Sequence, residues 1–181
     1  MEFYRELKTR DGRELILRNA VGTDAADFLD YFCQAHSETE YLTTYPDETK
    51  RNVANTTEDL EATRASERNI EICAFVDGRL VGSAGIELER DRAKTRHRAS
   101  FGISILRDYW GLGIGSLLTE SCIEVARRAG YLQIELDVVA ENEAAVALYK
   151  KYGFTEFGRN PRAFRTREGR WQEVILMRLE L

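Results

Sequence analysis

The chain has 181 residues, of which 43% are hydrophobic and 31% charged, the size and balance of a single soluble domain over residues 1–181. Its 31 acidic and 26 basic residues give a net charge of -5, which disfavours a nucleic-acid partner because phosphate backbones bind basic surfaces. No apolar run is long enough to span a bilayer, the first residues lack a signal-peptide core, and the three cysteines are widely spaced, so we expect a cytoplasmic protein with no membrane partner and no metal.

The N-terminal part is predicted to hold one short strand and two helices. Asp11-Gly12 is typical of a turn, and the apolar residues 15–17 predict a strand after it. Apolar residues at helical spacing predict a helix that ends at about Phe32, with Thr23 as its N-cap. After a polar loop, a second helix is expected over about 56–66.

The pattern becomes strand-like at residue 70. Apolar runs at 70–76 and 80–86 flank Asp77-Gly78, and an Asp-Gly pair between two such runs is among the strongest hairpin signals. A further strand is expected over 99–106, after a charged loop. These residues therefore predict three consecutive antiparallel strands.

Helices and strands alternate in the remaining chain. Apolar residues recur at helical spacing over 114–129 and at strand spacing over 132–138. A helix over 143–152 follows, and two closing strands at 154–157 and 173–181 are expected to flank a basic loop. The whole order predicts an α/β fold, a mixed sheet with helices on both faces.

A glycine-rich segment, Gly111 to Ser116, joins a predicted strand to the start of a predicted helix. Alternating glycines let backbone N–H groups converge on one point, and a helix N-terminus adds unpaired donors and a positive dipole end. This combination indicates a phosphate or pyrophosphate site. The chain has no Walker Gly-Lys-Ser/Thr run, and Ser116 stands where the dinucleotide motif needs its third glycine. The alternative is a tight turn without a ligand.

A second motif makes the first more specific. The segment from Asn142 to Phe154, NEAAVALYKKYGF, resembles the N-x-x-A-x-x-L-Y-x-K-x-G-F segment of the GCN5-related N-acetyltransferases. Tyr109 to Ser116 resembles their acetyl-CoA loop, with Trp110 where Arg or Gln is usual. The resemblance covers about residues 12–181. It implies an acetyltransferase with a mixed, mostly antiparallel sheet whose strands splay at the acetyl-CoA site.

The resemblance also implies roles for individual residues. The end of the strand before the loop would pair with the pantetheine arm, the loop amides would bind the pyrophosphate, and Asn142 would orient the cofactor or the loop. Tyr149 would face the thioester sulfur. The implied acetyl-CoA-binding residues are Ile103, Ser104, Ile105, Gly111, Leu112, Gly113, Ile114, Gly115, Ser116, Asn142, Tyr149 and Lys151.

Direct transfer to an amine within a ternary complex needs a proton acceptor for the amine and a donor for the leaving thiolate. Tyr149 can be the donor, because the ordinary pKa of tyrosine lies above that of a thiol and the hydroxyl is protonated near neutral pH. The alternative is a tyrosine that only packs on the sheet. Many relatives carry a Glu base on the strand before the loop, but that position is Ser100 here. We expect a water relay ending at Glu87. Other candidates are Glu135, Asp137, His36 and His97.

Residues 24–71 contain 12 acidic and 4 basic residues, and in the family this region forms one wall of the acceptor site. The expected partner is therefore a small-molecule or peptide amine, with cationic amines favoured; the alternative is a solvated acidic surface. We divide the domain into acceptor-side helices (12–70), an acetyl-CoA core (71–158) and a closing hairpin (159–181). Such hairpins often mediate homodimers in this family.

Two other functions stay open at this point. The missing Glu at Ser100 leaves room for a non-catalytic acetyl-CoA-binding or interaction module of the same fold, although the retained Tyr149 argues against it. A nucleotide-dependent oxidoreductase is disfavoured by the displaced third glycine.

Overall fold

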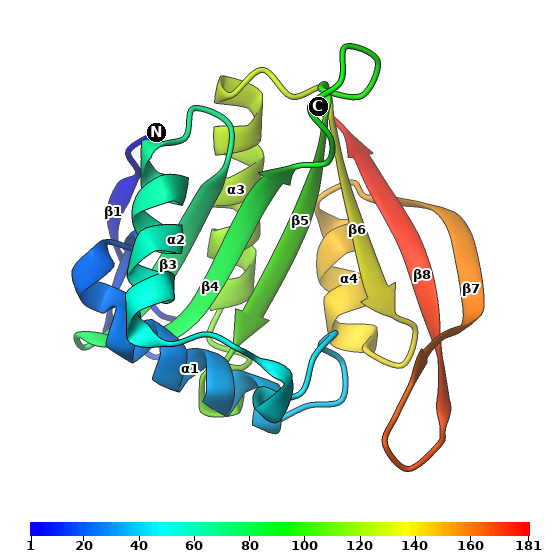
Figure 1. Ribbon diagram of the computed structural model, residues 1–181, viewed down its shortest axis with the longest axis horizontal. Helices are drawn as coiled ribbons and strands as arrows, with labels where there is room; N and C mark the ends of the chain where they lie inside the picture. The colour runs from blue at the N-terminus through cyan, green and yellow to red at the C-terminus, as the bar shows by residue number, and fades with distance from the viewer.

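The computed structural model describes all 181 residues and contains one eight-stranded sheet in the order β1-β2-β3-β4-β5-β6-β8-β7 (Figure 1). All neighbouring strands are antiparallel except β5 and β6, which confirms the predicted mixed, mostly antiparallel sheet. The strands are β1 (Tyr4–Lys8), β2 (Glu14–Asn19), β3 (Ile70–Val76), β4 (Arg79–Leu88), β5 (Arg98–Ile105), β6 (Gln133–Val139), β7 (Thr155–Arg165) and β8 (Trp171–Glu180).

Four α-helices cover the two faces of this sheet. In Figure 1, α1 (Ala25–Ser37) and α2 (Val53–Ala65) lie in front of it, and α3 (Ile114–Arg128) and α4 (Glu143–Lys151) lie behind it. Three short 3₁₀ turns occur, η1 (Gly22–Asp24), η2 (Pro46–Glu48) and η3 (Arg107–Tyr109). None of the helices is both long and apolar enough to cross a bilayer.

The central strands form as the sequence predicts. Asp77 and Gly78 both have positive φ, 48° and 82°, the conformation that lets a two-residue turn follow the twist of β3 and β4. Behind β3, β4 and β5, the helix α3 buries an apolar stripe that includes Leu118, Cys122 and Val125. Burial raises the pKa of the Cys122 thiol, which is a core residue as the helical spacing indicated.

The sequence prediction missed the first strand. β1 pairs with β2 at the edge of the sheet, and its residues Tyr4, Glu6 and Lys8 are exposed on one side while Leu7 is only partly buried on the other. An edge strand of this kind has no apolar alternation to detect. The β1–β2 hairpin matters because its turn reaches the glycine loop.

Both front helices differ from the prediction at their ends. Asp24, not Thr23, occupies the N-cap position of α1, and α1 continues past Phe32 to Ser37 because Ala35 extends the buried stripe. α2 starts at Val53, earlier than expected, because the Asn52 side chain accepts a hydrogen bond from the Asn55 amide (3.1 Å) and caps the helix.

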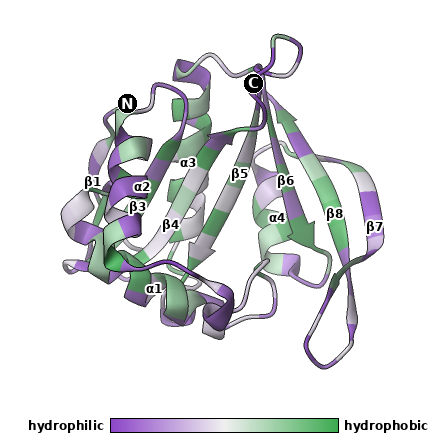
Figure 2. Cartoon of the chain, in the orientation of Figure 1, coloured by the Kyte–Doolittle hydropathy of each residue, from purple (hydrophilic) through white to green (hydrophobic).

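The predicted basic loop over 159–170 is wrong for most of its length, because β7 continues to Arg165 and leaves only a short turn before β8. Register shifts along β7 interrupt the alternation that would have predicted a strand, and Pro161 lies within this outer strand, a position that tolerates proline. Figure 2 shows hydrophilic residues along this outer strand, beside the more apolar β8.

Candidate active site

Strands β5 and β6 separate in the middle of the sheet (Figure 1). They pair only from Arg98 to Ser100, after which β5 stays with β4 and β6 stays with β8. The Leu106 amide donates to the Val81 carbonyl on β4, and backbone direction alternates along a strand, so Ile103 and Ile105 point their backbone groups toward β6. Beyond the splay, this edge of β5 has no partner strand.

Two of the predicted pantetheine-binding residues have partners within the protein. The Ile105 carbonyl accepts a hydrogen bond from the Trp110 indole (2.7 Å), which gives this unusual tryptophan a role in holding the loop to the strand. The Ser104 carbonyl accepts from the Tyr31 hydroxyl (2.8 Å) on the α1 side. The unpaired backbone N–H and C=O of Ile103 are therefore the groups best placed for a main-chain ligand.

The glycine loop leads directly into α3. Gly111 and Gly113 have positive φ, 77° and 89°, and no side chain caps the helix. None of the six amides from Gly111 to Ser116 donates a hydrogen bond within the protein; the first α3 bond runs from the Leu117 amide to the Gly113 carbonyl. Six free donors at a helix N-terminus fit a pyrophosphate group.

Two basic side chains border this loop. Arg10, in the β1–β2 turn, donates from its backbone to the Leu112 carbonyl (3.0 Å) and from its guanidinium to the Gly111 carbonyl (3.3 Å). Lys151, on α4, contacts the Ser116 hydroxyl at 3.4 Å. An acidic chain thus presents local positive charge here. Sequence reasoning could not find Arg10 without predicting the hairpin that carries it.

Tyr149 lies on α4, behind the splay. Asn142 caps this helix by accepting a hydrogen bond from the Ala145 amide (3.2 Å), so the structure gives it a role in fixing the start of α4. The Tyr149 ring packs edge-on against Phe101 of β5 (6.1 Å between centroids) and against Phe154. Burial raises the pKa of Tyr149 above its ordinary value. The Tyr149 hydroxyl makes no hydrogen bond. It is not among the fully enclosed side-chain atoms that lack a partner, which are Thr56 Oγ1, Arg68 Nε and Ser121 Oγ, so it keeps contact with solvent.

On the front face, a cavity of about 840 Å³ lies between the sheet, α1, α2 and the segment 42–51, and we call it the α1–α2 cavity. Its floor includes small residues on one face of β4 and β5, where Ser83 is paired with Ser104 and Gly85 with Gly102. Phe101 also lines the cavity, and its ring packs against Tyr149, so this one side chain connects the cavity to Tyr149.

Glu71 of β3 lies in the floor of the α1–α2 cavity and is the main functional candidate that sequence reasoning missed. It pairs with Gly85, and a Cβ on Gly85 would lie 2.5 Å from Glu71 Oε2, so the glycine leaves the space that the carboxylate occupies. Burial raises the pKa of Glu71 to about 7; the charge of Glu87 adds to this, while Ser83 and Arg51 oppose it. Glu71 is the sole charged residue in the otherwise apolar strand 70–76, and a lone charge in such a strand could have marked it as a functional candidate.

The other predicted proton acceptors divide into two groups. Glu87 is exposed and lines the same cavity, two residues beyond Gly85. His36 also lines it, stacked on Phe32 (3.9 Å) with its pKa lowered by burial. In contrast, Glu135 forms a two-bond ion pair with Arg98 (2.6 and 2.5 Å). Glu135 does not line the cavity, and neither do the two remaining candidates, Asp137 and His97.

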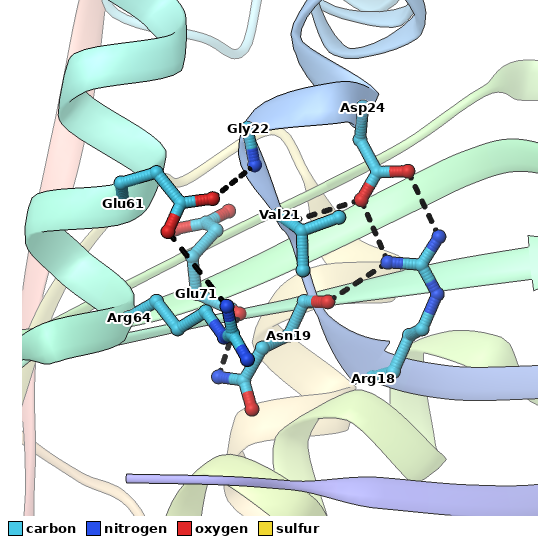
Figure 3. Close-up of polar contacts among 8 residues, drawn as sticks. All are labelled: Arg18, Asn19, Val21, Gly22, Asp24, Glu61, Arg64 and Glu71. Carbon is cyan, nitrogen blue, oxygen red and sulfur yellow. Dashed lines mark hydrogen bonds and ion pairs between the residues drawn. The ribbon is translucent and has the colours of Figure 1, made fainter.

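A polar cluster holds the α1–α2 wall in place (Figure 3). Arg18 of β2 donates to both oxygens of Asp24 (2.6 and 2.9 Å), and Asp24 also accepts from the Val21 amide (2.8 Å). Burial alone would raise the pKa of Asp24, but these donors outweigh it and lower that pKa. Glu61 of α2 accepts from the Gly22 amide (2.6 Å), which ties the second helix to the start of the first.

With this geometry in view, the comparison with known proteins is decisive. The family model described as Acetyltransferase (GNAT) family matches residues 29–154. The chain belongs to this family. An Escherichia coli L-amino acid N-acetyltransferase is 31% identical over 108 residues, and an E. coli [ribosomal protein bS18]-alanine N-acetyltransferase is 29% identical over 120 residues. These matches cover 59% and 66% of this chain, and 65% and 77% of the two relatives.

Solved structures agree with this GNAT assignment. An acetyltransferase of the GNAT family from Streptococcus pneumoniae superposes with a TM-score of 0.89 at 31% identity, covering 93% of this chain and all of that one. A Salmonella typhimurium structure that contains acetyl-CoA has a TM-score of 0.81, covering 92% and 94% of the two chains; at 22% identity it shows the fold alone. The family resemblance is confirmed, and the chain is an acyltransferase.

Proposed function

We propose that this GNAT chain transfers the acetyl group of acetyl-CoA directly to a primary amine of a small molecule or a polypeptide within a ternary complex. The observation that carries this proposal is the splay of β5 and β6. Around it lie the free amides of the glycine loop, the unpaired edge of β5 and the α1–α2 cavity. The names of the two E. coli relatives both describe transfer to an amine.

Bound acetyl-CoA supplies the acetyl thioester. The amides from Gly111 to Ser116 bind its pyrophosphate, with Arg10 and Lys151 beside them. The Ile103 edge pairs with the pantetheine arm as an added strand would. The Ile103 N–H has no partner within the protein, so it is a suitable donor to the thioester oxygen that becomes negative during attack. Asn142 contributes by fixing the helix that carries Tyr149.

The proton path in this proposal uses two carboxylates. The ammonium form of the acceptor binds in the acid-lined cavity and gives one proton to Glu71, whose pKa of about 7 suits a base near neutral pH. Water then passes this proton to exposed Glu87 and out to solvent, so Glu87 keeps the terminal role predicted from the sequence. Tyr149 donates a proton to the leaving thiolate and recovers one from the attacking nitrogen. Its raised pKa keeps it protonated until then.

The test is thiol release from acetyl-CoA in the presence of a panel of amines. We expect turnover in the wild type and a fall in kcat of about 100-fold or more in Tyr149→Phe, with little change in the KM for acetyl-CoA. Tyr4→Phe, at an exposed site, is the matched control. Tight acetyl-CoA binding with no thiol release for any amine would favour the alternative, a non-catalytic binding module.

The homodimer and the cytoplasmic location stay predictions. Sedimentation of the purified protein and fractionation of cells would test them. The acidic lining of the α1–α2 cavity, Glu48, Asp59, Glu71 and Glu87, supports a cationic amine as the acceptor.

A further inference from the structure

Arg51 is the one Lys or Arg side chain among the residues that line the α1–α2 cavity. It immediately precedes Asn52, the residue that caps α2, and its guanidinium lies over the Phe32 ring at 5.5 Å from the centroid. The guanidinium makes no hydrogen bond and no ion pair within the protein. Glu48 and Asp59 line the same cavity, but neither comes within ion-pair distance of it.

Arg51 is exposed, and its free guanidinium is distinguished by its place on the cavity wall. Residues 24–71 hold three times as many acidic as basic residues, yet Arg64 alone among the four basic residues forms an ion pair. Arg64, in the same wall, contacts both Glu2 and Glu61. Arg51 instead stacks on an aromatic ring, which holds the planar group in place while leaving its N–H donors free.

Arg51 lies close enough to the proposed proton acceptor for their charges to interact. Its positive charge opposes the rise in the pKa of Glu71 and adds to the fall in the pKa of His36. The cavity therefore has negative carboxylates in its floor and a free guanidinium nearby. A ligand that fits both must carry an ammonium and an anionic group close together.

We propose that Arg51 binds a carboxylate of the acceptor, so that the acceptor is a free α-amino acid and not the N-terminus of a polypeptide. This inference rests on the proposed function. The two N–H groups of a guanidinium match the two oxygens of a carboxylate, while the amine points to Glu71 and Glu87. Apolar lining residues, Phe28, Phe32, Leu42 and Leu60, favour an apolar side chain on that amino acid.

A polypeptide N-terminus has an amide in place of the α-carboxylate and would leave Arg51 without a partner in the occupied cavity. Sites with unpaired polar groups reject analogues strongly, whereas apolar contacts discriminate weakly. The choice between free and peptide-bound amino groups should therefore depend on Arg51.

The experiment compares kcat/KM for the twenty common L-amino acids and for their amides, in the wild type and in Arg51→Gln. The wild type is expected to prefer the free acids. In Arg51→Gln, kcat/KM for the best free acid should fall by roughly 10- to 100-fold while the matching amide changes little. Arg51→Lys should lie between the two, because it keeps the charge but not the planar fork. Arg64→Gln is the control outside the cavity.

The inference is overturned if the wild type acetylates amides as well as acids, or if Arg51→Gln lowers both equally. It is also overturned if amides, short peptides or other amines without a carboxylate are the only acceptors, although acetyl transfer itself would then stand. Absence of thiol release with every amine would instead remove the proposed function. An unchanged KM for acetyl-CoA in Arg51→Gln would verify that the variant is folded.

Discussion

Replacing Glu71 with Gln should stabilise the protein at high pH and not at low pH. Glu71 lies half-buried over Gly85, in the floor of the α1–α2 cavity, and its pKa is raised from 4.5 to about 7. A raised pKa means that the folded protein holds a proton that the unfolded chain has already lost. Between these two values the free energy of unfolding therefore decreases as the pH rises.

The magnitude follows from the same two values. Each pH unit between 4.5 and about 7 costs the wild type about 1.4 kcal/mol, so the total penalty above pH 7 is about 3 kcal/mol. Glutamine has a similar shape and does not titrate. The stability of Glu71→Gln relative to the wild type should thus increase by up to about 3 kcal/mol between about pH 5 and pH 8.

Urea denaturation of both proteins at several pH values measures this difference. Glu58→Gln, on the exposed side of α2, is the control and should show no such pH-dependent gain. A Glu71→Gln variant whose stability relative to the wild type is constant from about pH 5 to pH 8 would refute the reasoning. In that case Glu71 would be an ordinary solvated carboxylate and a poor base near neutral pH.

Three further variants test the rest of the site. Asp24→Asn should cost about 2 kcal/mol in urea denaturation because Arg18 loses its charged partner; since the pKa of Asp24 is lowered, this difference should disappear as the pH falls through that lowered value. Gly113→Ala should cost about 1 kcal/mol and weaken acetyl-CoA binding in calorimetry, because φ is 89° and the added Cβ would lie 3.3 Å from Arg10 Nε. Asn142→Ala should cost about 1 kcal/mol in thermal denaturation through loss of the α4 cap. Unchanged stability in any of these would contradict the contact named.

The central part of the fold could be predicted because its signals are local. The Asp77-Gly78 turn fixes the β3–β4 hairpin, and the apolar stripe from Ile114 predicts α3 with its glycine loop. The edges of the sheet were harder. β1 is polar on its exposed side, and β7 contains bulges and a proline, so neither has the alternation that a strand prediction needs.

The candidate site divides in the same way. The loop amides and Tyr149 belong to contiguous motifs, and a contiguous motif can be read from one sequence. Glu71 becomes a candidate only when the register places it over Gly85, and Arg10 only when a hairpin turn brings it to the glycine loop. Arg51 is one of many surface arginines until the cavity that it lines is known. These three depend on pairings between distant parts of the chain.

The measurement that tests the central claim most directly is a single-turnover reaction with acetyl-labelled acetyl-CoA and an apolar L-amino acid such as leucine, followed by mass spectrometry of both the small molecules and the intact protein. We expect one labelled N-acetyl amino acid for each thiol released, with no acetylated protein at any time. Acetyl-CoA that stays intact with every amine offered, or a labelled acetyl-protein that forms before the product, would contradict direct transfer at this site.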